Sequence, residues 1–256
     1  MTRTSERDLG TGRRGPARTR MAGLIGAAGP VGFAVAAVAA QSLQVGYDPA
    51  VEDLSALAAQ DAQHPWVMAA GILLLGTSVL ALAVGLRPRL VRGAAAQGGG
   101  VILLLLGAAL CAAAVLRNDC STETVACAER VMAGQVSWTH HGHDVAAILV
   151  IVLFVACPLV LAAAFARDPH WQHLQRPSQL AGVVGLVLLP AEMLAHDAGT
   201  MQRLAIVVPL LWLVAVALRL TTLRDDGSAR APGCVRRQHP QRAAAAMTSA
   251  CSRASS

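Results

Sequence analysis

The chain has 256 residues, of which 55% are hydrophobic, 14% are charged and 3% are aromatic. A soluble domain has about 25% charged residues, and a water-facing globule of this size cannot bury so much apolar surface. The composition therefore excludes a soluble enzyme, a disordered chain and a disulfide-rich secreted scaffold. All 21 basic residues are arginine, a bias typical of a GC-rich genome, so the net charge of +6 does not indicate a nucleic-acid partner.

Six apolar segments approach the length of roughly 20 residues that a helix needs to cross a bilayer. The last segment is short, but Arg203 and Arg219 at its two ends have side chains long enough to reach the lipid headgroups. We therefore predict an all-α fold, a polytopic membrane helix bundle with six transmembrane helices. The predicted spans are residues 21–43, 66–86, 98–116, 145–166, 179–195 and 204–218.

The arginines are unevenly distributed over the two sides that these spans define. All but three of the 21 lie in the terminal tails, the second-to-third loop and the fourth-to-fifth loop; the exceptions are Arg117, Arg130 and Arg203. The positive-inside rule then predicts that both termini lie in the cytoplasm, which indicates a cytoplasmic membrane protein. Signal-peptide cleavage after residues 37–40 would leave five spans, and the charge pattern favours an uncleaved first span.

The two ends of the chain differ in composition from the spans. Residues 1–21 and 221–256 are rich in Arg, Ala, Gly and Ser and have no apolar period. We predict that both are disordered cytoplasmic tails of a membrane domain at residues 22–220, whose partner is the lipid bilayer. No cytoplasmic segment is large or patterned enough to predict binding of a nucleotide or a nucleic acid.

Short polar motifs stand at the predicted membrane boundaries. They are Gly46-Tyr47-Asp48-Pro49, Asp53-Leu54-Ser55-Ala56-Leu57-Ala58, His64-Pro65-Trp66-Val67-Met68, His140 to Asp144, and Gly199-Thr200-Met201-Gln202-Arg203. Their order resembles the bacterial six-helix membrane family catalogued as domain of unknown function 998, over roughly residues 22 to 220. The resemblance implies a six-span integral membrane fold, and it implies no activity. Cys120 and Cys127 are not part of that family pattern.

Glu192 is the candidate functional residue that lies deepest, about 13 residues into the fifth predicted span. An ionisable side chain at such a depth costs several kcal/mol unless it is paired or hydrated. His196 follows four residues later, on the same helix face and one turn further out. An ion pair between Glu192 and Arg203 is the structural explanation, and a binding site is the functional one.

His140 and Asp144 repeat this arrangement at the start of the fourth span, again four residues apart, with His143 between them. Because spans four and five run in opposite directions, both His/carboxylate pairs fall on the outer side of the membrane. Asp119, at the end of the third span, lies on that side too. The topology therefore predicts a polar pocket that opens outward among spans three to six.

Three interpretations of this pocket stay open. The first is a cofactor-free site that binds or passes a small polar molecule, a proton or a lipid headgroup; its residues are Glu192, Asp144, His196, Arg203 and Asp119. The second is a metal-dependent membrane hydrolase with a carboxylate as base; its zinc ligands are His140 or His143, together with His196 and one carboxylate. The third is structural, since a carboxylate such as Asp144 in the first turn of a helix suits the positive end of the helix dipole.

Two cysteines lie in the outer third-to-fourth loop. Cys120 and Cys127 are separated by six residues, and thiols outside the cytoplasm are readily oxidised. We predict a disulfide that closes a small loop, against the alternative of two free thiols.

Overall fold

The computed structural model describes residues 14–121, 124–194 and 197–223; the side chains of residues 14–16, 189–194 and 198 are outside this description. All regular structure in the described residues is helical, which confirms the all-α prediction. The long helices are α1 (Arg14–Leu43), α2 (Pro65–Leu86), α3 (Ala94–Val115), α5 (Trp138–Phe165), α6 (Gln175–Leu194) and α7 (Ala198–Thr222). The short ones are α4 (Val125–Met132) and the 3₁₀ helices η1 (Leu54–Ala58), η2 (Arg87–Arg89) and η3 (Gln172–Leu174). The predicted tails lie largely outside the described residues, so their disorder stays a prediction.

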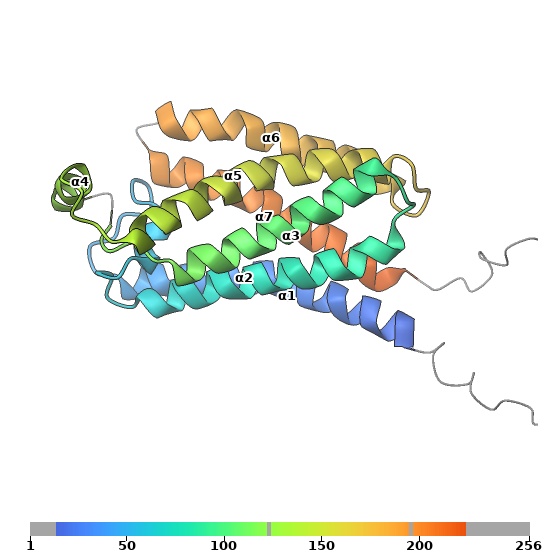
Figure 1. Ribbon diagram of the computed structural model, residues 1–256, viewed down its shortest axis with the longest axis horizontal. Coiled ribbons are helices and arrows are strands. Elements are labelled where there is room, and N and C mark those ends of the chain that lie inside the picture. The colour runs from blue at the N-terminus through green and yellow to red at the C-terminus, as the bar shows by residue number, and fades with distance from the viewer. Residues whose placement is uncertain (1–13, 122–123, 195–196, 224–256) are drawn as a thin grey trace, which may run out of the picture. The chain divides into compact units, whose positions relative to one another are not determined.

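The six long helices form a closed ring in chain order. Each helix packs along the next one, and α7 returns to pack along α1 (Figure 1). The connections alternate between the two ends of the bundle. At one end lie the start of α1, η2, η3 and the end of α7; at the other lie η1, α4 and the junction of α6 with α7. We call these the basic end and the loop end.

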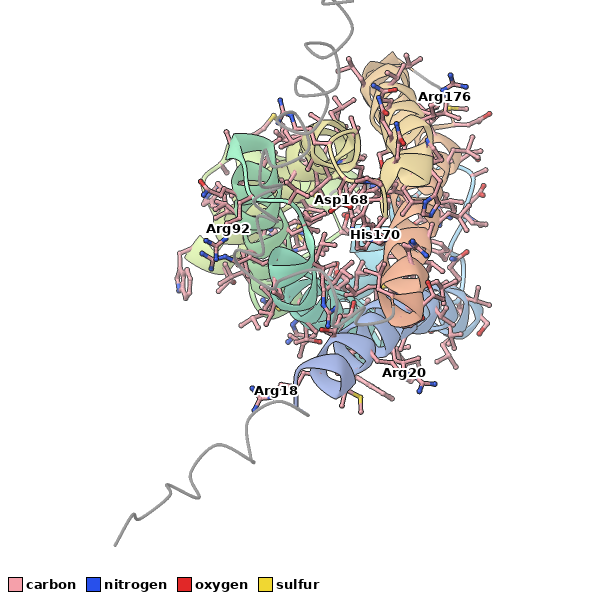
Figure 2. All side chains as sticks on the ribbon, turned by 90° about the vertical axis from the view of Figure 1, so that its right-hand side faces the viewer. Arg18, Arg20, Arg92, Asp168, His170 and Arg176 are labelled. Carbon is pink, nitrogen blue, oxygen red and sulfur yellow. A yellow bond between two sulfur atoms is a disulfide. The ribbon has the colours of Figure 1, made fainter. Side chains whose placement is uncertain are left out.

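Arginines gather at the basic end. Figure 2 looks onto this end, where Arg18, Arg20, Arg92 and Arg176 lie around the bundle, while Asp168 and His170 lie nearer its middle. The arginines with described side chains at this end are Arg18, Arg20, Arg87, Arg89, Arg92, Arg167, Arg176 and Arg219. Those at the loop end are Arg117, Arg130 and Arg203.

The outward faces of the helices are apolar. Five helices, α1, α2, α3, α5 and α7, are long and apolar enough to cross a membrane, while α6 has described side chains only as far as Leu188. On α1, the side chains of Val31, Val35 and Val38 are between 58% and 68% exposed. A helix that is apolar on both its inner and its outer face suits a lipid environment, so the bundle is a multi-pass membrane domain.

Two helices extend well beyond the predicted spans towards the loop end. α5 begins at Trp138 rather than at residue 145, and α7 begins at Ala198 rather than at residue 204. Counting apolar residues locates the hydrocarbon-spanning part of a helix, whereas backbone hydrogen bonding continues into the polar interface. The motifs around His143 and Arg203 are therefore helical, in the first two turns of α5 and α7.

Small residues allow the helices to approach closely. A Cβ atom added at Gly76 of α2 would lie 2.7 Å from Cys111 Sγ of α3, and one added at Gly182 of α6 would lie 2.4 Å from Leu159 Cγ of α5. Because packing replaces the hydrophobic effect as the attraction between helices in lipid, these contacts hold the ring together.

The basic half of the bundle has a filled core. Trp171 is fully buried and stacks on Phe165, with ring centroids 5.2 Å apart, and its indole N–H donates to Arg89 O over 3.3 Å. The buried carboxylate of Asp168 accepts from the backbone N–H groups of His170 (2.9 Å) and Val91 (3.3 Å). Apolar packing and satisfied polar groups thus close this half.

Candidate functional site

A cavity of about 360 Å³ lies inside the ring, in the half next to the loop end. All six long helices and η1 contribute to its lining. Its apolar wall includes Phe33, Met68, Ile72, Leu75, Leu110, Ile151, Phe154, Ile206 and Pro209. Its polar lining residues are Asp53, Ser55, Asn118, His143, Asp144 and Gln202, all close to the loop end. The cavity is therefore amphipathic, with one polar end.

The first loop covers this polar end. In η1, Leu54, Leu57 and Ala58 are buried, and Ser55 lines the cavity. The backbone N–H of Leu54 donates to Gln202 Oε1 of α7 over 2.7 Å. The loop between α1 and α2 is thus a built part of the bundle rather than a surface connection.

The start of α7 provides the seat for this loop. The N–H of Gly199 donates to Val51 O over 3.1 Å and that of Thr200 to Ala50 O over 3.0 Å. A Cβ atom at position 199 would lie 2.6 Å from Glu52 O, so only glycine leaves room for the loop backbone. This contact explains a glycine at the head of the Gly-Thr-Met-Gln-Arg motif.

Arg203 fastens the loop from the same helix. Its Nη1 donates to Glu52 O (3.0 Å) and to Gly199 O (2.7 Å), and its Nη2 donates to the Tyr47 hydroxyl over 2.5 Å. The hydroxyl of Tyr47 lies 3.0 Å from Asp53 O and 3.1 Å from Glu52 O, and shares its proton between them. Burial raises the pKa of Tyr47, opposed in part by the Arg203 hydrogen bond, so the phenol stays a neutral donor.

Asp119 likewise holds a neighbouring segment by hydrogen bonds, at the junction of α3 with α5. Its carboxylate accepts from Ser137 N (2.5 Å) and Ser137 Oγ (2.6 Å), and these hydrogen bonds hold its pKa below the ordinary value. Gln60 Nε2 also donates to Asp119, over 3.3 Å. Arg203 and Asp119, both predicted as ligand-binding, thus contact protein groups and are not among the described residues that line the cavity.

His140 and His143 lie one turn apart with opposite tautomers. Nδ1 of His140 accepts the N–H of Asp119 over 3.2 Å, so the proton of this buried, neutral ring is on Nε2. Nδ1 of His143 lies 2.7 Å from Leu116 O and 3.1 Å from Ala113 O, so it carries the proton, and Nε2 is the acceptor. One ring therefore offers a donor and the other an acceptor.

Asp144 lies beside the His140 ring and lines the cavity. Its Oδ2 is 3.9 Å from His140 Nε2, an atom that is buried without a hydrogen-bond partner among the described residues. Because α5 begins at Trp138, Asp144 stands in the second helical turn. The dipole of the first turn, on which the structural interpretation rested, does not account for its position.

The other predicted site residues belong to the proton-binding and the zinc-binding hypotheses. The side chain of Glu192 and the whole of His196 lie outside the described residues, so the Glu192–Arg203 pair stays a prediction. A neutral histidine that binds zinc through Nε2 carries its proton on Nδ1, whereas Nδ1 of His140 accepts a hydrogen bond from Asp119 N and so carries no proton. His143 rather than His140 therefore has the tautomer that zinc binding through Nε2 needs, and the zinc set with His196 stays a prediction because His196 lies outside the described residues.

In the structure a disulfide joins Cys120 to Cys127, with the two Cα atoms 5.8 Å apart. It ties the end of the α3–α4 connection to α4, whose N-cap Thr124 accepts from Cys127 N over 3.2 Å. Cys120 and Cys127 are both buried. The bridge holds α4 against the connection that follows α3, next to the Asp119 junction.

Two residues that line the cavity were not predicted from the sequence as site residues. Asn118 is the only asparagine of the chain, and its buried side chain lines the cavity with Oδ1 unpartnered among the described residues. Gln202 lines the cavity from α7. The sequence signal for Asn118 is a single amide side chain next to Asp119 at the end of a predicted span. Because an amide does not ionise, a search for ionisable side chains does not find it.

The apolar ring of helices and its interior cavity define an integral membrane protein with several spans. The chain belongs to the family described as Protein of unknown function (DUF998), which matches residues 27–219. Neither a curated protein nor a solved structure matches it. The matched range contains the first loop, the start of α5 and the start of α7, the segments that surround the polar end of the cavity.

Proposed function

We propose that this membrane protein binds a small molecule or a lipid headgroup in the cavity, with its polar part at the loop end. The observation that carries the proposal is the amphipathic lining: all six long helices supply apolar wall or small residues, and the polar residues collect at one end. A volume of about 360 Å³ falls within the range of roughly 300–1,000 Å³ typical of small-molecule sites.

Binding is better supported than passage through the bundle. The helix segments beyond the cavity, towards the basic end, carry the fully buried side chains of Leu82, Leu103, Phe165 and Leu213. Trp171 and the Asp168 contacts close the same half. A solute that enters from the loop end therefore meets a packed core rather than a path.

The proposed orientation has the basic end in the cytoplasm of a bacterium and the cavity facing the outer leaflet. The arginines of the basic end support it through the positive-inside rule. Trp66 and Trp138 also support the membrane boundary at the loop end, since each stands in the first turn of its helix and is 67% or 74% exposed, respectively. Tryptophans of this kind are enriched at membrane–water interfaces.

Glu192 stays the proposed ligand-binding or proton-binding carboxylate on α6. It follows Gly185, a lining residue, by seven positions, and positions seven apart in an α-helix share a face. Glu192→Gln is expected to abolish binding while leaving membrane insertion intact. Full binding by this variant would remove Glu192 from the site.

The proposal is tested with the full chain in nanodiscs, by native mass spectrometry of what remains bound after purification. Ala147→Leu fills the cavity, since Ala147 lines it, whereas Ala163→Leu adds the same group to an exposed position of the same helix. We expect a bound molecule in the wild type and in Ala163→Leu, and its loss in Ala147→Leu. Equal occupancy in the two variants, or none in the wild type, would contradict a binding cavity.

A further inference from the structure

We propose that one acyl chain of a membrane lipid occupies the cavity and enters it from the side, between α5 and α6. This inference rests on the proposed function and names the class of its ligand and the route of entry. We call the boundary between the two helices the α5–α6 seam. On α5 it consists of residues that recur every three or four positions and so share one helix face: Leu159, Val155, Ile151, Ile148 and Asp144.

In the middle of α6, small residues hold the seam closed. A Cβ atom added at Gly182 would lie 2.4 Å from Leu159 Cγ, and one added at Gly185 would lie 3.1 Å from Val155 Cγ2. Beyond these contacts the backbones of α5 and α6 diverge, and they stand well apart at the loop end (Figure 1). The face of α5 that α6 covers at Val155 is therefore further from the α6 backbone at Ile148.

The next seam residues line the cavity and are exposed as well. Ile151 is 38% exposed and Ile148 is 61% exposed, and the side chain of Asp144 is 46% exposed. Contact with the cavity does not by itself give such values, because Met68 and Leu75 line the same cavity and are each 1% exposed. Ile148 and Ile151 therefore stand at a mouth, where the cavity meets the outside of the bundle.

The mouth faces lipid rather than water. On α5 the neighbouring Leu149 is 48% exposed, and on α6 the residues after Gly185, Leu186 and Val187, are 59% and 62% exposed. Ile148 follows the exposed Trp138 by ten positions, which is about 15 Å of helix. Since such a tryptophan is typical of the membrane–water interface, an opening this far along α5, with apolar surface on either side, lies among acyl chains.

The water-facing end of the cavity is covered by contrast. The first loop lies over it, with Leu54 and Leu57 of η1 buried. The N–H of Leu54 donates to Gln202 Oε1, and Arg203 fastens the loop to α7. A molecule dissolved in the membrane therefore meets an opening, whereas a molecule dissolved in water meets a built loop.

An acyl chain matches the interior behind the mouth. Met68, Ile72 and Leu75 of α2 form part of the apolar wall across the ring from the seam. Because lipid tails are as apolar as leucine, the chain exchanges one apolar environment for another. What favours its entry is dispersion contact with walls that otherwise face empty space. Ser55 and Gln202 lie at the loop end of the cavity, on the headgroup side of such a chain.

The test is photo-crosslinking of the full chain in phosphatidylcholine nanodiscs with a trace of phosphatidylcholine that carries a diazirine at the end of one acyl chain. Tandem mass spectrometry maps the adducts along α2. Met68 and Ile72, the cavity pair, are buried and line the cavity, whereas Leu73 and Leu74, the outer pair, are 42% and 45% exposed and do not line it. We expect adducts at both pairs, since a chain inside the cavity reaches the first and the surrounding lipid reaches the second.

Two variants obstruct the path at separate positions. Ala147→Leu fills the cavity, and Ile148→Trp places a larger side chain at its mouth. Each should lower the adducts at the cavity pair about tenfold and leave those at the outer pair unchanged, which also reports correct insertion. Leu149→Trp is the matched control, because it adds the same ring at the next exposed position, which does not line the cavity; it should be labelled like the wild type.

The outcomes separate this inference from the proposed function. Adducts at the outer pair alone, with a molecule that native mass spectrometry finds in the wild type and not in Ala147→Leu, would overturn entry of an acyl chain and leave the binding cavity standing. Equal labelling of the cavity pair in Ile148→Trp and Leu149→Trp would overturn entry through the seam. Absence of both cavity-pair adducts and a retained molecule would overturn the inference and the proposed function together.

Discussion

In the half of the bundle next to the basic end, leucine and aromatic side chains fill the ring, whereas in the other half the same helices surround a cavity. Leu103 and Leu110 illustrate the difference on one helix face of α3: both are buried, at 0% and 4% exposure, but only Leu110 lines the cavity. The basic half is therefore a packed core, and the half next to the loop end contains a cavity.

Polar groups follow the same division. In the basic half, Asp168 and the Trp171 indole have hydrogen-bond partners. The buried side-chain atoms without a partner among the described residues all belong to the loop end: Asn118 Oδ1, Ser121 Oγ, His140 Nε2 and Arg203 Nε. Native proteins satisfy most buried polar groups, so the loop half is the less completely satisfied of the two, and of these four residues only Asn118 lines the cavity.

The largest expected effect compares Leu103→Ala with Leu110→Ala. Truncating a leucine in a filled core lowers the free energy of unfolding by about 2–5 kcal/mol, and Leu103 has this environment. Leu110 already faces an empty space on one side, so its truncation should cost about half as much. Reversible unfolding in mixed micelles measures both, and equal losses would show that the two halves are equally packed.

Gly199→Ala tests the seat of the first loop. The added methyl group would meet the carbonyl oxygens of Glu52 and Pro49 at 2.6 and 2.9 Å, and overpacking of this kind lowers stability by about 1–3 kcal/mol. Gly100→Ala is the control, since nothing lies within 4 Å of its added Cβ atom. If both substitutions have the same effect on thermal unfolding, the loop does not depend on this close contact.

Tyr47→Phe tests whether the first loop keeps the polar end of the cavity closed. The substitution removes the acceptor of Arg203 Nη2 and the donor to the Glu52 and Asp53 carbonyls, a loss of about 1–2 kcal/mol. We expect faster amide hydrogen exchange in residues 46–59 and unchanged exchange in η3 of the basic half. Faster exchange in both regions would mean that the two halves unfold as one unit.

The smallest expected effect concerns pH and Asp119. Because its folded-state pKa is lowered, the ionised carboxylate stabilises the fold above about pH 4, and this contribution is lost as the pH falls through the lowered pKa. Asp119→Asn should lower stability at neutral pH by about 1 kcal/mol and flatten the acid side of the profile. Thermal unfolding from pH 7 to pH 3 measures this, with Glu129→Gln as control; an unchanged profile in Asp119→Asn would assign the acid sensitivity to other groups.

The sequence by itself determined the class of the protein. Apolar segments of membrane-spanning length specify helices because every backbone polar group in lipid needs an internal partner, and the order of the motifs was sufficient to indicate the family. The distribution of arginine also distinguished the two ends. The predicted boundaries were least accurate at Arg14, Trp138 and Ala198, where polar residues continue a helix beyond the hydrocarbon.

Only the tertiary structure decided which polar residues surround a cavity and which bind the protein itself. Arg203 and Asp119 looked like ligand-binding groups in sequence, yet their partners are loop atoms of Glu52, Tyr47 and Ser137. Asn118 looked unremarkable and lies in the lining. Closure of the ring, with α7 packed along α1, brings these distant segments together, and no local pattern along the chain encodes a contact between residues that are about 150 positions apart.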